Sequence, residues 1–374
     1  MDRKRATQSF VLVLLTFAAR SAIAMTYTVT LLSPPAGYNE SAVSGISASQ
    51  QAGYYFNVIT SYRAAYWNGA SDSIVDLHPA DYFDTVASDT TGNVQVGYGL
   101  RASFGGAPHA LLWRGTAESV VDLNPNGFLY SQAYAASDER QVGFGYRDDQ
   151  VSRALMWRGT AESVVDLHPT GYDTSHASDV NGSYQVGSAY AFNTVRAMLW
   201  HDTAESAIDL HPPAYALSVA TAVSDGQQVG RAIIDDPFPF LYHAILWSGS
   251  AESAVDLTPL GFLTTYATGV ARGIQVGAGS GPATAGQTHA LRWNGTSESV
   301  LDLHQFLEGL PVTMVHSGAT NIHSNGTIVG TAIDENDRSY AVLWTPVVPE
   351  PSSCALVVCG LVATALLARR NRPR

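Results

Sequence analysis

The feature that most constrains this chain is a repeat whose internal spacing is fixed. Trp113 to Pro125 reads WRGTAESVVDLNP and Trp157 to Pro169 reads WRGTAESVVDLHP, so the two thirteen-residue segments differ at one position. In five units the tryptophan precedes this proline by 12 residues, and the proline precedes the glycine of a QVG marker by 18. The step from that glycine to the next tryptophan varies between 13 and 17 residues. Such spacing indicates one structural unit copied along the chain, with its length variation confined to one connection.

Each unit contains four short segments that are typical of β-strands. A run of small residues such as Ala133 to Asp138 comes first, and a turn rich in Asp, Asn and Gly separates it from the QVG run. A third run ends at the tryptophan, and the fourth is the SVVDL run after the RGTAE turn. Four strands at a period near 44 residues match the blade of a β-propeller. We therefore predict an all-β, seven-bladed propeller with four strands per blade; the alternatives are an open solenoid and a two-domain sandwich.

Side-chain size predicts where each strand lies within a blade. The alanines, serines and glycines of the first segment suit the crowded axis of a propeller. The glycine of QVG is expected to let neighbouring sheets approach closely. The tryptophans, together with the Val and Leu pairs, are expected to fill the wider space between blades farther from the axis.

The two ends of the repeat predict how the ring closes. The last unit stops after Trp344 without an SVVDL strand, and it carries an insertion from His304 to Ser317. A matching segment is found at the other end, where Thr28 to Ser44 aligns with Val164 to Ser178. We therefore expect the N-terminal strand to complete the final blade, because closure removes exposed strand edges.

Ser163, Asp166 and His168 have the side chains of a hydrolase triad. In an extended strand, however, residues two apart share a face, and Ser163 lies three residues from Asp166. The set also recurs in several units, with Asn124 and Thr258 in place of the histidine, whereas a catalytic site occurs once. We therefore expect a structural role, with the aspartates accepting hydrogen bonds from turn donors, and we predict no catalytic residue.

The remaining histidines and acids predict no zinc site and no organic cofactor. The histidines of the DLHP-type runs occupy equivalent positions in different units: His78, His168, His211 and His304. A ring holds such positions apart, whereas zinc ligands converge at about 2 Å from the metal. The acidic loops Asp235 to Pro237 and Asp334 to Arg338 offer oxygen ligands for Ca²⁺ without the spacing of an EF-hand, so calcium there stays an open hypothesis. The sequence has no P-loop, dinucleotide-binding or HExxH motif.

The N-terminus predicts export. Arg3-Lys4-Arg5, the apolar run from Phe10 to Ala19 and the small-x-small site Ala22-Ile23-Ala24 predict a signal peptide over residues 1–24. An uncleaved anchor helix is the alternative, although the apolar run is short for a bilayer. Cleavage would leave residues 25–347 as the exported repeat domain.

The C-terminus predicts a sorting segment over residues 348–374. Pro349-Glu350-Pro351 is followed by an apolar run, 354–368, that predicts a short transmembrane helix, and then by an arginine cluster that begins with Arg369 and Arg370. This segment resembles the PEP-CTERM sorting signal of Gram-negative bacteria. The resemblance implies an exosortase-type processing enzyme as a partner, transient anchoring in the membrane, and transfer to the cell surface or the extracellular polymer. A plain tail anchor is the alternative.

Composition excludes two other classes. Both cysteines, Cys354 and Cys359, lie in the apolar tail, so the exported domain cannot depend on disulfides. Between Met25 and Val348 there are 12 arginines and 30 acidic residues, which gives a net charge near −18. Nucleic acid is therefore not expected as a partner, because its binding draws on clustered Lys and Arg. Cations and neutral glycans fit this charge better.

The HAxLW runs and the glycine that follows resemble the HAF family of bacterial extracellular repeats over most of residues 26 to 345. Arg replaces His in three units, Tyr340 replaces it in the last, and the Phe of the family pattern is replaced by aliphatic residues. The resemblance implies surface export and a repeat fold. It implies no defined chemistry.

The connection between the second and third strands differs most from unit to unit, and it predicts where binding occurs. In a propeller these connections project from one face, together with the crossings between blades. A rigid scaffold with variable loops is a common support for a binding site. Aromatic candidates for stacking on sugar rings are Phe104, Phe192, Phe238, Phe240 and Tyr242.

These observations lead to one prediction of function and one alternative. We predict a non-enzymatic cell-surface or extracellular-matrix protein that binds polysaccharide or another surface protein through this face. The alternative is a propeller glycosidase or lyase that acts on extracellular polysaccharide. Such an enzyme would show unique carboxylates at the central opening.

Overall fold

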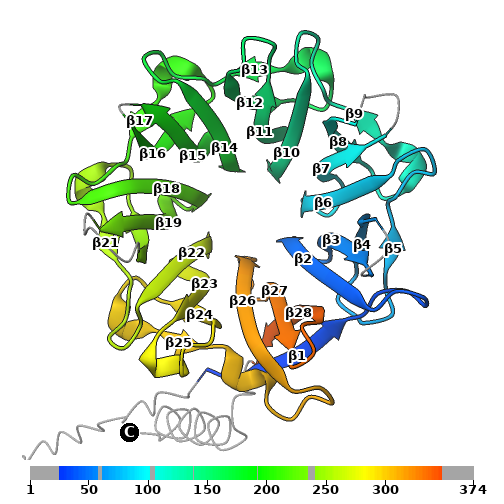
Figure 1. The fold of residues 1–374 in the computed structure, drawn as a ribbon, viewed down its shortest axis with the longest axis vertical. Coiled ribbons are helices and arrows are strands. Elements are labelled where there is room, and N and C mark those ends of the chain that lie inside the picture. The colour runs from blue at the N-terminus through cyan, green and yellow to red at the C-terminus, as the bar shows by residue number, and fades with distance from the viewer. Residues whose placement is uncertain are drawn as a thin grey trace, which may run out of the picture.

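The computed structural model describes residues 25–57, 61–101, 106–137, 139–191, 193–234 and 241–347. Within these ranges the chain forms seven four-stranded antiparallel sheets around a central axis (Figure 1). The predicted seven-bladed propeller is therefore confirmed. The predicted signal peptide and the sorting segment, with Pro349, Glu350, Pro351, Arg369 and Arg370, lie outside the described residues. Among the described elements, no helix has the length and apolar character needed to cross a membrane.

Each blade runs from the axis to the rim, and we number the blades 1 to 7 in chain order. The innermost strands are β2 (Glu40–Ile46), β6 (Asp84–Thr90), β10 (Tyr130–Ser137), β14 (Thr174–Asn181), β18 (Tyr215–Ser224), β22 (Thr264–Ala271) and β26 (Met314–Ile322). The second strands are β3 (Gln51–Phe56), β7 (Gln95–Leu100), β11 (Arg140–Tyr146), β15 (Tyr184–Ala191), β19 (Gln227–Ile234), β23 (Ile274–Ser280) and β27 (Ile328–Asp334). The third strands are β4 (Arg63–Trp67), β8 (Pro108–Trp113), β12 (Ser152–Trp157), β16 (Thr194–His201), β20 (Tyr242–Trp247), β24 (His289–Trp293) and β28 (Ser339–Pro346). The outer strands are β5 (Val75–Asp76), β9 (Val121–Asp122), β13 (Val165–Asp166), β17 (Ile208–Asp209), β21 (Val255–Asp256), β25 (Leu301–Asp302) and β1 (Tyr27–Leu32).

The ring closes as predicted, with the N-terminal strand β1 in blade 7. β1 pairs antiparallel with β28, and Tyr27 lies opposite Pro346. This outer strand has six residues where the other outer strands have two, so it presents a longer edge. The first part of the predicted insertion, the 3₁₀ helix η8 (His304–Leu307), packs against it, and the rings of Phe306 and Tyr27 lie 5.5 Å apart. The end of the predicted insertion belongs instead to β26, which begins at Met314.

The tryptophans fill the spaces between blades, as their size predicts. Each is completely buried. Trp157 of blade 3, for example, packs with Val96 and Leu112 of blade 2. Burial of a side chain of this size accounts for a large part of the apolar contact between neighbouring sheets.

The contact that requires a glycine in the QVG marker differs from the one predicted. Each innermost strand carries a β-bulge, and a Cβ atom on Gly97 would lie 1.8 Å from the carbonyl oxygen of Val86 just before this bulge. The marker glycines of the other blades meet the corresponding carbonyl at 1.9 to 2.0 Å. The close approach therefore occurs within one blade, between its first and second strands, and not between neighbouring sheets.

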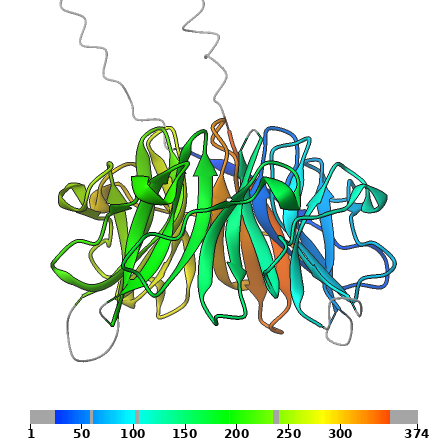
Figure 2. The ribbon, with the colours of Figure 1, turned by 90° about the horizontal axis from the view of Figure 1, so that it is seen from above.

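The disc has two faces, which are seen edge-on in Figure 2. The loop face carries the connections from the second to the third strand and the crossings from each outer strand to the next blade. The hairpin face carries the turns that join the first strand to the second and the third strand to the fourth. The start of β1 at Tyr27 and the end of β28 at Pro346 pair with each other on the hairpin side of the disc.

Candidate functional site

The triad-like residues are parts of a structural bridge between blades. His168 lies in the crossing from blade 3 to blade 4, and its Nδ1 is 2.8 Å from Oγ of Ser175. The same Oγ accepts a hydrogen bond of 2.9 Å from the backbone N–H of Ala154 in blade 3. Nε2 of His168 lies 3.1 Å from the carbonyl oxygen of Tyr172. The buried Ser175 hydroxyl thus joins two blades, and the imidazole holds it in place.

Asn124, the one difference between the two segments WRGTAESVVDLNP and WRGTAESVVDLHP, performs the same task in blade 2. Its Nδ2 donates to the carbonyl oxygen of Phe128 at 3.1 Å, and its Oδ1 accepts from Oγ of Ser131 at 2.7 Å. A neutral histidine at the matching position can donate through Nε2 and accept through Nδ1 in the same way. Burial, reinforced by the charge of Arg153, lowers the pKa of His168 and favours this neutral form.

The repeated aspartate and serine are also engaged locally. Oδ1 of Asp166 accepts the backbone N–H of His168 at 2.9 Å, and Oδ2 lies 3.5 Å from a guanidinium nitrogen of Arg153. Ser163 ends the 3₁₀ helix η3 (Ala161–Ser163), where its Oγ accepts from the N–H of Arg158 and donates to the carbonyl oxygen of Thr160. This turn shortens the predicted SVVDL strand to two residues. The prediction that the aspartates satisfy turn donors is confirmed.

The residues proposed from the variable loops lie mostly beyond what the structure describes. Phe104, Phe192, Phe238 and Phe240 are outside the described residues, as is the acidic loop Asp235 to Pro237. Tyr242 begins β20, and the guanidinium carbon of Arg231 lies 5.3 Å from the centre of its ring.

The second acidic loop forms a turn. The carboxylate of Asp334 accepts the backbone N–H groups of Asn336 and Arg338 at 2.8 and 2.9 Å, which closes the connection from β27 to β28. In the described part of the chain, no group of three or more His, Cys, Asp or Glu is placed to hold a metal ion.

A belt of aromatic side chains that was not predicted runs across blades 1 to 3, from mid-strand positions such as Tyr134 to the loop-facing ends of strands, as at Tyr146. We call it the aromatic belt; its members are Tyr54, Phe56, Tyr62, Tyr98, Tyr130, Tyr134, Phe144 and Tyr146. In blade 1 the ring centres of Tyr54 and Phe56 each lie 5.2 Å from that of Tyr62. In blade 3 the rings of Tyr130 and Tyr146 stack at 4.9 Å. These distances are typical of favourable aromatic pairs.

A signal for the belt was present in the sequence. The residue after the marker glycine is Tyr54, Tyr98 or Phe144 in blades 1 to 3. In blades 4 to 7 the equivalent residues are Ser188, Arg231, Ala278 and Thr331. Comparison of the units at this position, and not only in the loops, would have indicated an asymmetric aromatic surface.

Exposed side chains accompany the belt on the loop face: Tyr62 of the belt precedes β4, and Phe83 and Leu129 precede the innermost strands β6 and β10. The exposed fraction is 45% for Tyr62, 58% for Phe83 and 54% for Leu129. Phe83 and Leu129 occupy equivalent positions in successive blade crossings, where their backbone N–H groups bond to the ends of β7 and β11. Exposed apolar side chains that cluster in this way are typical of binding surfaces.

The axis holds a pocket of about 330 Å³ that all seven innermost strands line. The seven bulge residues that face it all carry a hydroxyl group: Ser44, Ser88, Tyr134, Ser178, Thr221, Thr268 and Thr320. Thr221, Thr268 and Thr320 each donate to a carbonyl oxygen of the next blade at 2.7 to 2.9 Å. The described axial wall is therefore tied together from blade to blade by polar contacts.

Two carboxylates, those of Asp89 and Asp179, also line the axial pocket. Each bonds forward to the next blade: Asp89 accepts the N–H of Ala136 at 2.9 Å, and Asp179 accepts the N–H of Val223 at 2.8 Å. Burial raises the pKa of Asp89 to about 7, and the charge of Asp179 adds to this shift. Burial likewise raises the pKa of Asp179 to about 6.

Comparison with known proteins shows the fold. The structure is similar to that of a Mycobacterium tuberculosis puromycin-hydrolyzing peptidase, with a TM-score of 0.56 and 10% identity over 84% of this chain and 54% of that one. It is also similar to a puromycin hydrolase, with a TM-score of 0.52 and 10% identity over 83% of this chain and 56% of that one. The β-propeller domain of the Trilobed protease from Pyrococcus furiosus gives a TM-score of 0.43 and 9% identity over 83% and 82% of the two chains.

These likenesses carry no activity across to this chain. The chain spans about half the length of the two hydrolases. No protein-family model matches it, and no curated protein matches it either. The resemblance to the HAF repeats therefore rests on the motifs alone, and a function has to be argued from the residues of the site.

Proposed function

We propose that this protein is an exported, non-enzymatic binding protein that holds an extracellular polysaccharide of neutral sugars on its loop face. The observation that carries the proposal is the aromatic belt. The repeated positions of the blades are occupied by structural bridges, whereas the belt breaks the sevenfold repeat and gathers rings on one side of the opening. Symmetry-breaking side chains on a rigid scaffold are where a specific site is expected.

Neutral sugar is the ligand class that this surface fits best. One face of a sugar ring presents C–H groups, and an aromatic ring carries negative charge on its face, so the two stack favourably. The exported domain has a net charge near −18, which repels anionic polymers at low ionic strength. Tyr62, the exposed ring of the belt, and the half-buried rings beside it offer stacking area without any added positive charge.

A glycosidase is the second candidate, because Asp89 and Asp179 are two carboxylates of raised pKa in one central pocket. Glycosidases use such a pair, with one carboxyl protonated as an acid. Here, however, each carboxylate is bonded to a backbone amide of the next blade. These hydrogen bonds give both carboxylates a structural role in holding neighbouring blades together. They therefore favour a binding protein over a hydrolase.

The binding experiment is isothermal titration of the full-length protein with the polysaccharide of its host. Tyr62→Ala is expected to weaken binding about 3- to 10-fold, which corresponds to the loss of one aromatic contact. Tyr184→Ala is the matched control, because Tyr184 is 48% exposed, against 45% for Tyr62, but begins β15 at the hairpin face. Equal affinities for the parent and both variants would contradict the role of the belt.

A reducing-end assay on the same polymer separates the two candidates. Accumulation of reducing ends that is lost in both Asp89→Asn and Asp179→Asn would establish the glycosidase. Saturable binding without release supports the binding protein.

Export and processing belong to the same proposal. The motifs support a protein that is exported, anchored transiently by residues 354–368 and processed by an exosortase-type enzyme at Pro349-Glu350-Pro351. Replacement of these three residues by alanine is expected to retain the protein in the membrane fraction of its host. Equal amounts of parent and variant at the cell surface would contradict this route.

A further inference from the structure

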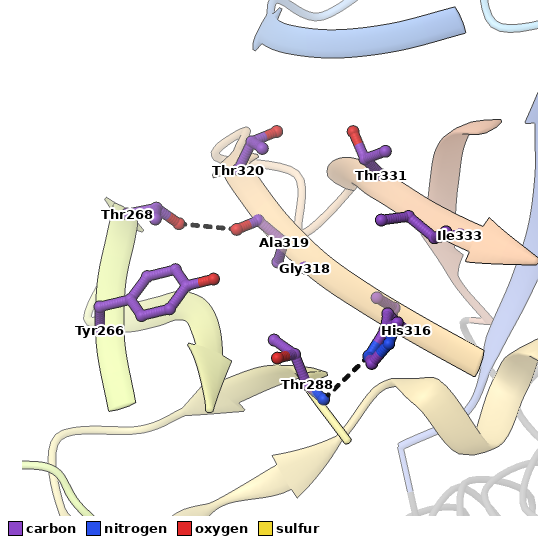
Figure 3. Close-up of a pocket in the computed structure, with 10 residues that line it drawn as sticks. Tyr266, Thr268, Thr288, His316, Gly318, Ala319, Thr320, Thr331 and Ile333 are labelled. Carbon is purple, nitrogen blue, oxygen red and sulfur yellow. Dashed lines mark hydrogen bonds between the residues drawn. The ribbon is translucent and has the colours of Figure 1, made fainter. Parts of the chain in front are cut away.

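A pocket of about 480 Å³ lies between blades 6 and 7, beside the axis (Figure 3). Tyr266 of β22 forms one wall, and β26 forms the other with His316 and Gly318. Thr331 and Ile333 of β27 complete the lining on the side of blade 7. The volume and the largely apolar lining are typical of a small-molecule site.

The pocket exists because two small residues meet at this interface. At the same level of other interfaces, the residue after the marker glycine of one blade faces the innermost strand of the next, as the rings of Phe144 and His176 do at 4.3 Å. Between blades 6 and 7 the corresponding residues are Ala278 and Gly318. A Cβ atom on Gly318 would meet Ala278 Cβ at 3.7 Å and no other atom within 4 Å. The absent side chains leave the space.

The pocket combines an apolar floor with hydrogen-bonding groups that the fold does not use. Ile333, Ala319 and Gly318 provide apolar surface. Oη of Tyr266 and Oγ1 of Thr331 have no hydrogen-bond partner among the described residues, in contrast to the hydroxyl groups of the structural bridges. No carboxylate, lysine or arginine belongs to the described lining. An uncharged ligand with one apolar end and several hydroxyls matches these groups.

We infer that this pocket binds one residue of the polysaccharide, a neutral hexose that carries a methyl group as a 6-deoxy or N-acetyl substituent. The methyl group would lie against Ile333 and Ala319, and the sugar hydroxyls would bond to Tyr266 and Thr331. This inference rests on the proposed function, and it names the sugar class that the loop face selects. The aromatic belt would then supply stacking along the polymer, while the pocket supplies the choice of sugar.

The test is titration of the full-length protein with methyl glycosides of L-rhamnose, N-acetylglucosamine, glucose and glucuronic acid, and with the host polymer. The expected result is that at least one methyl-bearing sugar binds about 4-fold more tightly than glucose, as the burial of a methyl group predicts. Gly318→Tyr, which places in blade 7 the residue that blade 6 carries at Tyr266, is expected to abolish this preference. Tight binding of the glucuronide, or equal binding of all four sugars, would overturn the inference.

A second variant keeps the test valid if Gly318→Tyr fails to fold. Thr331→Val preserves the shape of the side chain and is expected to weaken binding of the preferred sugar about 3- to 10-fold through the loss of one hydrogen bond. Thr345→Val is its control, because Thr345 is an exposed residue of β28 outside the pocket. Unchanged affinity in the pocket variants, with polymer binding still dependent on Tyr62, would overturn the pocket and leave the proposed function intact. Absence of all sugar and polymer binding by the parent would overturn the proposed function itself.

Discussion

Substitution of Asp89 by asparagine is expected to stabilise the protein at alkaline pH. The pKa of Asp89 is raised from 3.8 to about 7 in the folded protein, so the folded state binds the proton more tightly than the unfolded state does. For a carboxyl of raised pKa, stability is fully present below the unfolded value and is lost as pH rises through the folded value. The asparagine side chain would keep an oxygen acceptor for the N–H of Ala136 without the buried charge.

The magnitude follows from the shift. At about 1.4 kcal/mol per pKa unit, a shift of about three units corresponds to about 4 kcal/mol at pH 8. The side chain is partly open to the axial pocket, where solvent screens its charge, so we expect a gain of about 2 kcal/mol. At pH 4.5 the carboxyl is protonated in the folded state, and little difference from the parent is expected.

Urea denaturation followed by circular dichroism at pH 4.5, 6 and 8 measures this difference. The parent also loses stability as pH falls below about 6.5, because burial lowers the pKa of His168 and its equivalents in the fold. Comparison of parent and variant cancels this contribution. Asn321→Asp is the reciprocal control, since Asn321 holds the equivalent position in blade 7, and it is expected to lose stability at pH 8. A difference for Asp89→Asn that is constant across pH, or a loss at pH 8, would refute the reasoning.

Three further variants test the architecture by thermal or urea denaturation. His168→Asn is expected to be nearly neutral because Asn124 already fills this role, whereas His168→Leu should cost about 1–3 kcal/mol by leaving its partners unbonded; equal losses would contradict the bridge. Gly97→Ala should cost about 2–3 kcal/mol, since its Cβ would meet the Val86 carbonyl oxygen at 1.8 Å, and an unchanged midpoint would show that the bulge can move. Deletion of residues 25–32 should lower the midpoint and broaden the transition because it exposes the edge of β28; an open stack of blades would instead unfold with unchanged cooperativity.

The architecture could be predicted from the sequence because its determinants repeat. The fixed steps of 12 and 18 residues established the unit, and the VTLLSP segment at residues 29–34 identified the closing strand. The repeat pattern could not predict which contact requires a glycine at the marker position. A one-dimensional pattern shows that a side chain is excluded, but it does not show which neighbour excludes it. The structure identifies that neighbour as the bulged innermost strand of the same blade.

The candidate sites were harder to predict for a related reason. The chemistry-bearing side chains of WRGTAESVVDLHP recur from unit to unit, and recurrence marks the bridges that hold blades together. The residues proposed for binding are those at which one unit departs from the others within a regular strand, such as Tyr98 on one side of the axis and Gly318 on the other. In the sequence alone such departures cannot be distinguished from neutral substitutions. The fold shows that they lie around one central opening.

The same ring explains how binding and stability can change independently in this fold. Neighbouring blades are joined by hydrogen bonds from backbone N–H groups to side chains. Ser175 accepts one from Ala154 of the preceding blade, and Asp89 accepts one from Ala136 of the next. Among the described residues, the side chains of the belt and those of Tyr266 and Thr331 in the pocket make no such polar contact with a neighbouring blade, although Thr268, Ser317 and Thr320 in the wall of the same pocket do. A substitution there changes the surface offered to a ligand while the bridges remain, and Gly318 shows that even a whole side chain can be lost without breaking the blade-to-blade contact made by Thr268. Ligand specificity in a propeller of this kind is therefore expected to vary at the residues that flank the marker glycines and the bulges, while the polar bridges stay constant.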